Sequence, residues 1–342
     1  MYSRHCAPMN DAKSGRCAAI FGLLSTVLSA KERTFFAKVD PFGFILFSRN
    51  IQTADQIRSL CADLRETVGW YAPIFIDQEG GRVQRLREPL VKEWPALLEH
   101  VDITGENAEQ QIFTRYLIIA QELRNLGITA NCAPVADIAH PHTHKVLKNR
   151  CFGRDAMTVS RLARVAANGL LTGGVLPVLK HIPGHGLAQV DSHKEAPIVA
   201  ESKELLAAID FAPFNALNDL PIGMTAHVIY QNIDAKPGTV SEKIIRLIRS
   251  ELGFGGLLMS DDISMKALGD KLAIRAKAVI DAGCDLVLHC NGELEEMSII
   301  ADSVGKMSAT AQLRADKVKA LHNSLSGITV ELAQAYAQLE TR

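Results

Sequence analysis

Eight short apolar runs recur along the chain, and stretches with helical periodicity separate them. Most of the runs are continuously apolar rather than alternating, which is typical of parallel strands covered on both faces. This repeated order of strand and helix restricts the chain to α/β folds built on a parallel sheet. The predicted strands are residues 18–22, 43–47, 73–77, 128–134, 175–180, 222–227, 256–261 and 286–290.

Capping residues mark the starts of two predicted helices. The string TADQ at 53–56 has the spacing of a capping box, in which the first side chain and the fourth each bond a backbone N–H of the first turn. Ser241 precedes a predicted helix on which Ile244, Ile248 and Leu252 share one apolar face. Both signals place a helix directly after a loop.

Eight such units predict an α/β fold with a single (β/α)8 barrel of the TIM type, in which chemistry lies in the loops after the strands. An open doubly wound sheet fits less well, because no G-x-G-x-x-G follows the first strand and the polar residues are spread over many strand ends. We expect residues 1–17 to form a flexible N-terminal segment. Residues 18–342 should form one catalytic domain that includes a closing helix over 311–321 and a second helical tail.

The charge balance gives no electrostatic reason to expect nucleic acid or an anionic membrane as a partner, because the 342 residues carry a formal net charge of -1. With 47% hydrophobic residues, the chain can bury a large core. Neither a signal peptide nor a run of about 18 apolar residues is found. Seven cysteines without a C-x-x-C pair indicate reduced thiols. We expect a cytoplasmic monomer without metal or cofactor.

Polar residues close most of the predicted strands. In a barrel, the carboxyl ends of the strands meet at one mouth, so these side chains should converge there. Any one of them could be an ordinary solvated strand end, but their convergence from six strand ends favours a functional site. The residues are Asp77, Asp137, Lys180, His181, His227, Asp261 and Asn291.

Two strings supply the groups needed to split an acetal. Asp261 ends an apolar strand, which presents its carboxylate rigidly as a candidate nucleophile. Adjacent side chains on a strand face opposite sides, so Asp262 should point elsewhere. His193 is the candidate general acid/base, because an imidazole titrates near pH ~6.5, and Asp191 can orient it and favour its protonated form.

Four strings resemble the bacterial β-N-acetylglucosaminidases of glycoside hydrolase family three: IDQEGGRVQRLR (76–87), NCAPVADI (131–138), KHIPGHG with DSHKEAP (180–197) and LLMSDDISM (257–265). The resemblance runs from about Ile20 to about Asn291. It implies a single-barrel enzyme of peptidoglycan recycling that removes terminal N-acetylglucosamine from muropeptides. The expected substrates are N-acetylglucosamine-anhydro-N-acetylmuramic acid and its peptides, cleaved with retention through a covalent glycosyl-enzyme intermediate.

The resemblance also implies a set of sugar-binding residues. Carboxylate and guanidinium groups suit pairs of neighbouring hydroxyls because each offers two parallel hydrogen-bonding positions. For Arg85 and Arg150, the alternative is an ion-pair network that braces the barrel rim, and we expect Glu79 and Asp137 to support loops. Around Arg150 the string VLKNRCFG departs from the usual family pattern. The implied set is Asp77, Arg85, Arg150, Lys180 and His181.

Several alternatives stay open at this point. A β-glucosidase or β-xylosidase of the same family would differ in whether its pocket accepts a 2-acetamido group. A glycoside phosphorylase is possible because a neutral imidazole repels incoming phosphate less than a carboxylate does. A non-catalytic sugar-sensing barrel should have lost the nucleophile or the acid/base, yet both are present. Zinc at His181, His185 and His193 is disfavoured because Pro183 breaks the helix that an i, i+4 pair requires. The histidines at 140, 142 and 144 should lie in an exposed loop, and no H-E-x-x-H or cysteine quartet accompanies either group.

Overall fold

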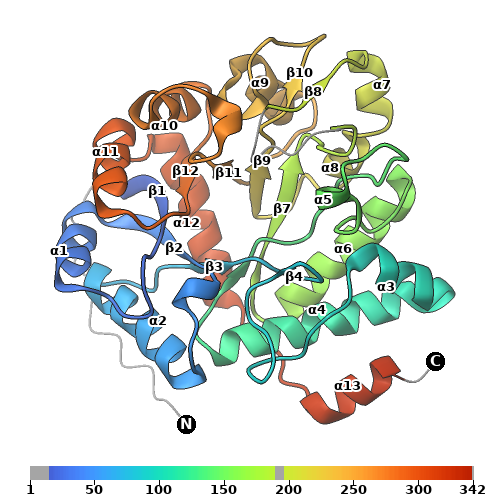
Figure 1. Ribbon diagram of the computed structural model, residues 1–342, viewed down its shortest axis with the longest axis horizontal. Coiled ribbons are helices and arrows are strands. Elements are labelled where there is room, and N and C mark those ends of the chain that lie inside the picture. Colours follow the sequence, from blue (N-terminus) through green and yellow to red (C-terminus); the bar gives the residue numbers. More distant parts are fainter. Residues whose placement is uncertain (1–14, 189–195, 341–342) are drawn as a thin grey trace.

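The computed structural model describes residues 15–188 and 196–340, and its core is a closed barrel of parallel strands inside a ring of helices (Figure 1). The strands follow the order β1-β12-β11-β9-β7-β6-β3-β2, and β1 closes the barrel by pairing with both β2 and β12. Each strand falls within or overlaps a predicted apolar run, so the predicted (β/α)8 barrel is confirmed. The strands are β1 (Cys17–Gly22), β2 (Pro41–Leu46), β3 (Ile74–Ile76), β6 (Ala130–Asn131), β7 (Leu176–Ile182), β9 (Ile222–Thr225), β11 (Leu257–Asp262) and β12 (Leu286–His289).

Helices connect successive strands and cover the outside of the barrel (Figure 1). Among the described residues, none of them is long and apolar enough to cross a membrane. The last helix, α13, lies at the periphery beside α4. The helices are α1 (Ala30–Val39), α2 (Ala54–Val68), α3 (Leu97–Thr104), α4 (Ala108–Asn125), α5 (Lys145–Lys148), α6 (Ala156–Thr172), α7 (Lys203–Ala208), α8 (Ala212–Ala216), α9 (Glu242–Ser250), α10 (Leu272–Asp281), α11 (Leu294–Val304), α12 (Ala309–Ser324) and α13 (Leu332–Glu340).

Two small sheets lie in the loops that follow barrel strands. β4 (Gln78–Gly80) pairs antiparallel with β5 (Val83–Gln84) in the loop after β3. β8 (Ile198–Val199) pairs parallel with β10 (Ile229–Tyr230), which joins the loop after β7 to the loop after β9. The remaining short elements are 3-10 turns at Ser48–Asn50, Gly105–Asn107, Gly238–Val240 and Lys266–Leu268.

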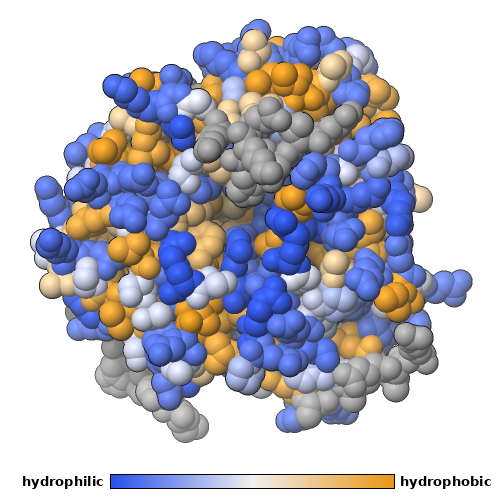
Figure 2. Space-filling view, viewed as in Figure 1, coloured by the Kyte–Doolittle hydropathy of each residue, from blue (hydrophilic) through white to orange (hydrophobic). Residues whose placement is uncertain are grey.

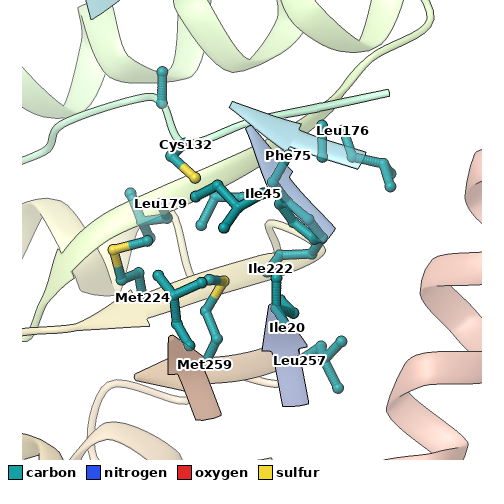
Figure 3. Close-up of a cluster of buried hydrophobic side chains, with 14 of the residues drawn as sticks. Ile20, Ile45, Phe75, Cys132, Leu176, Leu179, Ile222, Met224, Leu257 and Met259 are labelled. Atoms are coloured by element: carbon teal, nitrogen blue, oxygen red, sulfur yellow. The ribbon is translucent and has the colours of Figure 1, made fainter. Parts of the chain in front are cut away.

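Apolar side chains from different strands fill the barrel. Ile20, Ile45, Phe75, Ile222 and Met259 are all buried and converge in the cluster shown in Figure 3. Dense packing of this kind makes the interior of such a barrel a core rather than a pore. The polar side chains are therefore left to the ends of the strands, where the loops carry them.

Helix starts agree with the sequence better than helix ends do. Thr53 accepts the N–H of Gln56 at 3.2 Å, but Gln56 Oε1 accepts from the N–H of Gln52, so only half of the predicted capping box forms. Ser241 caps α9 as predicted. Leu252 lies beyond the end of that helix, because α9 stops after nine residues, although the side chain is still buried.

The predicted elements at the two ends of the chain can also be compared with the structure. The closing helix predicted over 311–321 is α12, which is longer at both ends, and the predicted tail is α13. Most of the predicted N-terminal segment lies outside the described residues, and its last residue, Cys17, is the first residue of β1. The six cysteines of the described residues are free thiols.

Candidate active site

The loops at the carboxyl ends of the barrel strands bring the predicted sugar-binding side chains into one network. Asp77 follows β3, and Lys180 and His181 lie near the end of β7, whereas Arg85 and Arg150 come from the loops beyond β5 and α5. Figure 2 shows hydrophilic side chains gathered over the loop that carries β4, on the face of the molecule seen in Figure 1. This clustering is the one expected for the mouth of such a barrel.

Asp77 is held by two cations. Its Oδ2 accepts from Arg85 Nη2 at 2.9 Å, and its Oδ1 accepts from Lys180 Nζ at 3.0 Å. Burial disfavours the charged carboxylate, but Lys180 and Arg85 outweigh this effect, so the pKa of Asp77 lies well below its usual range. Asp77 is therefore an anion at neutral pH with a fixed orientation, and 15% of its side chain remains exposed for a ligand.

Glu79 forms ion pairs with Arg150 and with Lys180, the lysine that also binds Asp77. Arg150 donates to both of its oxygens, from Nε and Nη2, at 2.8 Å each, and Lys180 Nζ lies 2.6 Å from Oε1. Burial raises the pKa of Glu79, but the charges of Arg150 and Lys180 lower it further than burial raises it. Two carboxylates and three cations thus form one continuous network, because Lys180 bridges Asp77 and Glu79.

His181 is oriented by a buried carboxylate. Its Nδ1 lies 2.7 Å from Asp137 Oδ2 and donates to it, and its Nε2 lies 3.5 Å from Arg150 Nη2. The other oxygen of Asp137 accepts the N–H of His185 at 2.7 Å. Asp137 therefore supports both a candidate binding residue and the loop after β7, which agrees with the supporting role expected from the sequence.

The two neighbouring acids at the end of β11 have different environments. Asp262 accepts the N–H of Ser264 at 3.1 Å and the N–H of Cys290 at 3.2 Å on Oδ1, and the hydroxyl of Ser264 at 2.5 Å on Oδ2. Its carboxylate is thus occupied in shaping the turn after the strand. Asp261 makes a single described hydrogen bond, from the N–H of Asp262 at 2.8 Å.

The charge of Asp261 is favoured by its neighbours. Burial raises the pKa of its carboxyl, but the imidazoles of His227 and His181 and the N–H of Asp262 outweigh that effect, so the pKa lies below its ordinary value. His227 is fully buried, and its Nε2 lies 3.0 Å from the carbonyl of Asp262. A partly exposed carboxylate that stays ionised suits a nucleophile better than a proton donor.

The remaining predicted residues divide into those that are described and those that are not. Asp191 and His193 fall within 189–195, outside the described residues. Asn291 donates to Glu296 at 3.3 Å, in an exposed position. His140 pairs with Asp210 at 2.9 Å. Within the described ranges, no three His, Cys, Asp or Glu side chains are arranged to hold a metal ion.

Arg115 is a supporting residue that the sequence did not reveal. It is fully buried, and its Nη2 donates to the carbonyls of Glu79 at 2.6 Å and Pro95 at 2.9 Å. Gly80 is required beside it, because a Cβ there would lie 1.9 Å from the same nitrogen. Arg115 lies inside a helix, and its sequence neighbourhood carries no signal of this contact with the loop after β3.

Comparison with known proteins identifies the class. Residues 22–323 match the family described as the glycosyl hydrolase family 3 N terminal domain. The chain therefore belongs to glycosyl hydrolase family 3, and it is a hydrolase. Curated relatives of this chain are named β-hexosaminidase. The relative from Pseudomonas aeruginosa is 35% identical over 305 residues, which cover 87% of this chain and 90% of that protein.

A second sequence relative and a solved structure also support membership of this family. A β-hexosaminidase of Bordetella avium is 38% identical over 258 residues, which cover 73% of each chain. The crystal structure of native NagZ from Neisseria gonorrhoeae has 29% identity and a TM-score of 0.84, over 96% of this chain and 99% of that chain. The resemblance to the family 3 β-N-acetylglucosaminidases that the sequence motifs indicated is thus confirmed.

Proposed function

We propose that this protein is a retaining exo-β-N-acetylglucosaminidase that acts through a covalent glycosyl-enzyme intermediate. The observation that carries the proposal is Asp261, an ionised carboxylate at a strand end, beside a network of charged groups suited to sugar hydroxyls. The relatives named β-hexosaminidase support the choice of sugar. Asp261 attacks the anomeric carbon, and water later hydrolyses the resulting ester.

His193 is the proposed general acid/base, oriented by Asp191. It protonates the glycosidic oxygen as Asp261 attacks and then takes a proton from the water that releases the sugar. An imidazole in this role replaces the second carboxylate of most retaining glycosidases. The proposal rests on the D-S-H string and on its place in the chain between β8 and β7, the strand that carries Lys180 and His181 of the network.

The charged network is proposed to bind the sugar. Asp77 accepts from hydroxyls, while Arg85, Lys180 and Arg150 donate to them, and His181 contributes from its imidazole. The ion pairs already fix these groups in place, so substrate binding costs little additional ordering. Binding of several hydroxyls also holds the anomeric carbon in line with Asp261.

The proposed substrates are muropeptides, with N-acetylglucosamine linked to anhydro-N-acetylmuramic acid and its peptides, and the proposed setting is peptidoglycan recycling by a cytoplasmic monomer. Support comes from the motifs of the single-barrel branch of the family. No cofactor enters this mechanism, because both catalytic groups are side chains. A single catalytic domain from residue 18 onward accounts for all the proposed chemistry.

Replacement of Asp261 tests the proposal. Asp261→Ala should lose essentially all turnover of a nitrophenyl N-acetylglucosaminide, and retention of more than roughly a tenth of the rate would refute the nucleophile. Asp281→Ala, at an exposed pair on α10, is the matched control and should keep full activity. A mechanism-based fluorosugar should lose its leaving group and add the mass of its fluoroglycosyl group to the peptide that contains Asp261, in the wild type alone.

The same assay separates the alternatives. A clear preference for the N-acetylglucosaminide over the matching nitrophenyl glucoside supports the proposed sugar, and the opposite preference favours a β-glucosidase. Release of sugar 1-phosphate in phosphate buffer, instead of free sugar, would indicate a phosphorylase, because phosphate would then replace water in the second step.

A further inference from the structure

We infer that Tyr230 is a positioning residue for the general acid/base, because it joins the two ends of the segment that carries Asp191 and His193. The inference rests on the proposed function, which assigns proton transfer to His193. The contacts that matter lie on either side of 189–195, since that segment is outside the described residues.

The upstream end is tied down by buried hydrogen bonds. The hydroxyl of Tyr230 donates to the carbonyl of Gly184 at 2.6 Å, and the N–H of His185 donates to Asp137 at 2.7 Å. All four residues are buried. The chain therefore leaves β7 along a fixed path, because each bond would leave a buried polar group unpaired if the path changed.

Close packing adds to this constraint. The hydroxyl of Thr143 donates to the carbonyl of Gly186 at 2.5 Å. A Cβ at Gly186 would lie 2.3 Å from the carbonyl of Ile138, and one at Gly184 would lie 2.8 Å from the carbonyl of Asp210. Gly184 also has a φ of +146°, a conformation that side chains rarely permit. The two glycines allow the backbone to lie directly against its neighbours.

The downstream end is held by the strand that contains Tyr230. The N–H of Ile229 donates to the carbonyl of Pro197 at 2.8 Å, and the N–H of Gln231 donates to the carbonyl of Val199 at 2.9 Å. These bonds are the parallel pairing of β8 with β10. The chain is therefore fixed again within a few residues of the end of the segment.

Tyr230 is the residue that links the two ends. Its backbone lies opposite Val199 in the small sheet, while its hydroxyl reaches Gly184. The ring is 1% exposed and packs edge-on against Phe211, with centroids 5.5 Å apart and planes at 81°. One rigid side chain thus sets the spacing between the two ends of the segment.

A small error in that spacing affects proton transfer selectively. A general acid acts only within hydrogen-bond reach of the glycosidic oxygen, and a misplacement of about 1 Å can cost two orders of magnitude in rate. Substrates with poor leaving groups need the proton, whereas activated nitrophenyl glycosides leave without it. Loss of the hydrogen bond from Tyr230 to Gly184 should therefore lower kcat/KM for substrates with poor leaving groups and leave it nearly unchanged for activated ones.

Tyr230→Phe is the direct test, because it removes the hydroxyl and keeps both the ring against Phe211 and the backbone of β10. The readout is the ratio of kcat/KM for an alkyl N-acetylglucosaminide to that for a dinitrophenyl N-acetylglucosaminide. We expect the ratio to fall about tenfold, with less than about a twofold change for the activated substrate. A misfolded fraction cancels from the ratio, since both substrates are measured on the same sample.

Three further variants complete the experiment. Thr143→Val loosens the same end through Gly186 and should lower the ratio in the same direction. Tyr336→Phe removes a tyrosine hydroxyl bonded to Glu122, in another part of the molecule, and should leave the ratio unchanged. His193→Ala sets the full effect of losing the acid.

The outcomes separate the inference from the function on which it rests. An unchanged ratio in Tyr230→Phe, beside a reduced ratio in His193→Ala, overturns the role of Tyr230 and leaves the proposed acid/base intact. An equal fall in Tyr336→Phe overturns it as well, because the effect would then not be specific to this contact. An unchanged ratio in His193→Ala refutes the acid/base, and the inference fails with it.

Discussion

At the scale of single residues, Glu122 on α4 joins three separate parts of the chain. Its Oε1 accepts the hydroxyl of Tyr336 from α13 and the N–H of Lys92 at 3.2 Å. Only 5% of the residue is exposed. Burial raises the pKa of Glu122 to about 7, although both hydrogen bonds act in the opposite direction. The carboxyl is therefore partly protonated near neutral pH.

Glu122→Gln should remove the loss of stability that this carboxyl causes as the pH rises from about 4.5 to 7. A raised pKa in the folded state means that the stabilisation is complete below pH ~4.5 and is lost as the pH rises through about 7. The loss amounts to roughly 3 kcal/mol. Urea unfolding at several pH values measures it, and an unaltered slope in the variant would contradict the assignment.

At the scale of elements, a helix start can carry more than a cap. Ser241 accepts the N–H of Ile244 at 3.2 Å, which caps α9, and it donates to Asp234 at 2.6 Å. It is fully buried. Ser308 caps α12 by accepting the N–H of Ala311 at 3.1 Å, but it is exposed. The two serines have the same sequence signature and different surroundings.

Ser241→Ala should therefore cost more stability than Ser308→Ala. Loss of an exposed cap costs about 1 kcal/mol, whereas loss of the buried one also leaves Asp234 without a partner hydroxyl and should cost about 2 kcal/mol or more. Chemical denaturation of both variants measures the difference. Equal losses would show that the bond to Asp234 contributes nothing measurable.

At the scale of the whole molecule, the barrel concentrates ionised carboxylates at one end. Burial raises the pKa of each, but neighbouring cations, imidazoles and N–H groups outweigh burial, so all four pKa values are lowered. The charged state of each carboxylate is thus linked to the folded barrel, because the partners come from different loops. The four are Asp77, Glu79, Asp137 and Asp261.

Stability should fall steeply below pH ~4. A lowered pKa in the folded state gives stabilisation that is present above the unfolded value and is lost as the pH falls through the folded one. Glu122 acts in the opposite direction near neutrality. Melting temperatures from pH 3 to 8 test this prediction. Asp281→Asn, at an exposed ion pair, is the control and should show the same fall in Tm at low pH as the wild type. A constant Tm from pH 5 to 3 would contradict the prediction.

Much of the fold was determined by the sequence alone. The eight strands could be placed because continuous apolar runs are a local consequence of burial on both faces, and their number then favoured a barrel over an open sheet. Asp261 could be placed at a strand end for the same reason. Ser241 could be placed at a helix start because a cap depends only on the first turn.

Only the tertiary structure decided which side chains share a contact. Glu79, Arg150 and Lys180 lie far apart in the sequence, and strand register and loop path bring them together. Arg115 and Tyr230 act through carbonyls of other loops, and no local pattern encodes such partners. The physical reason is range: periodicity and capping act within a few residues, whereas these contacts exist only once the barrel has closed.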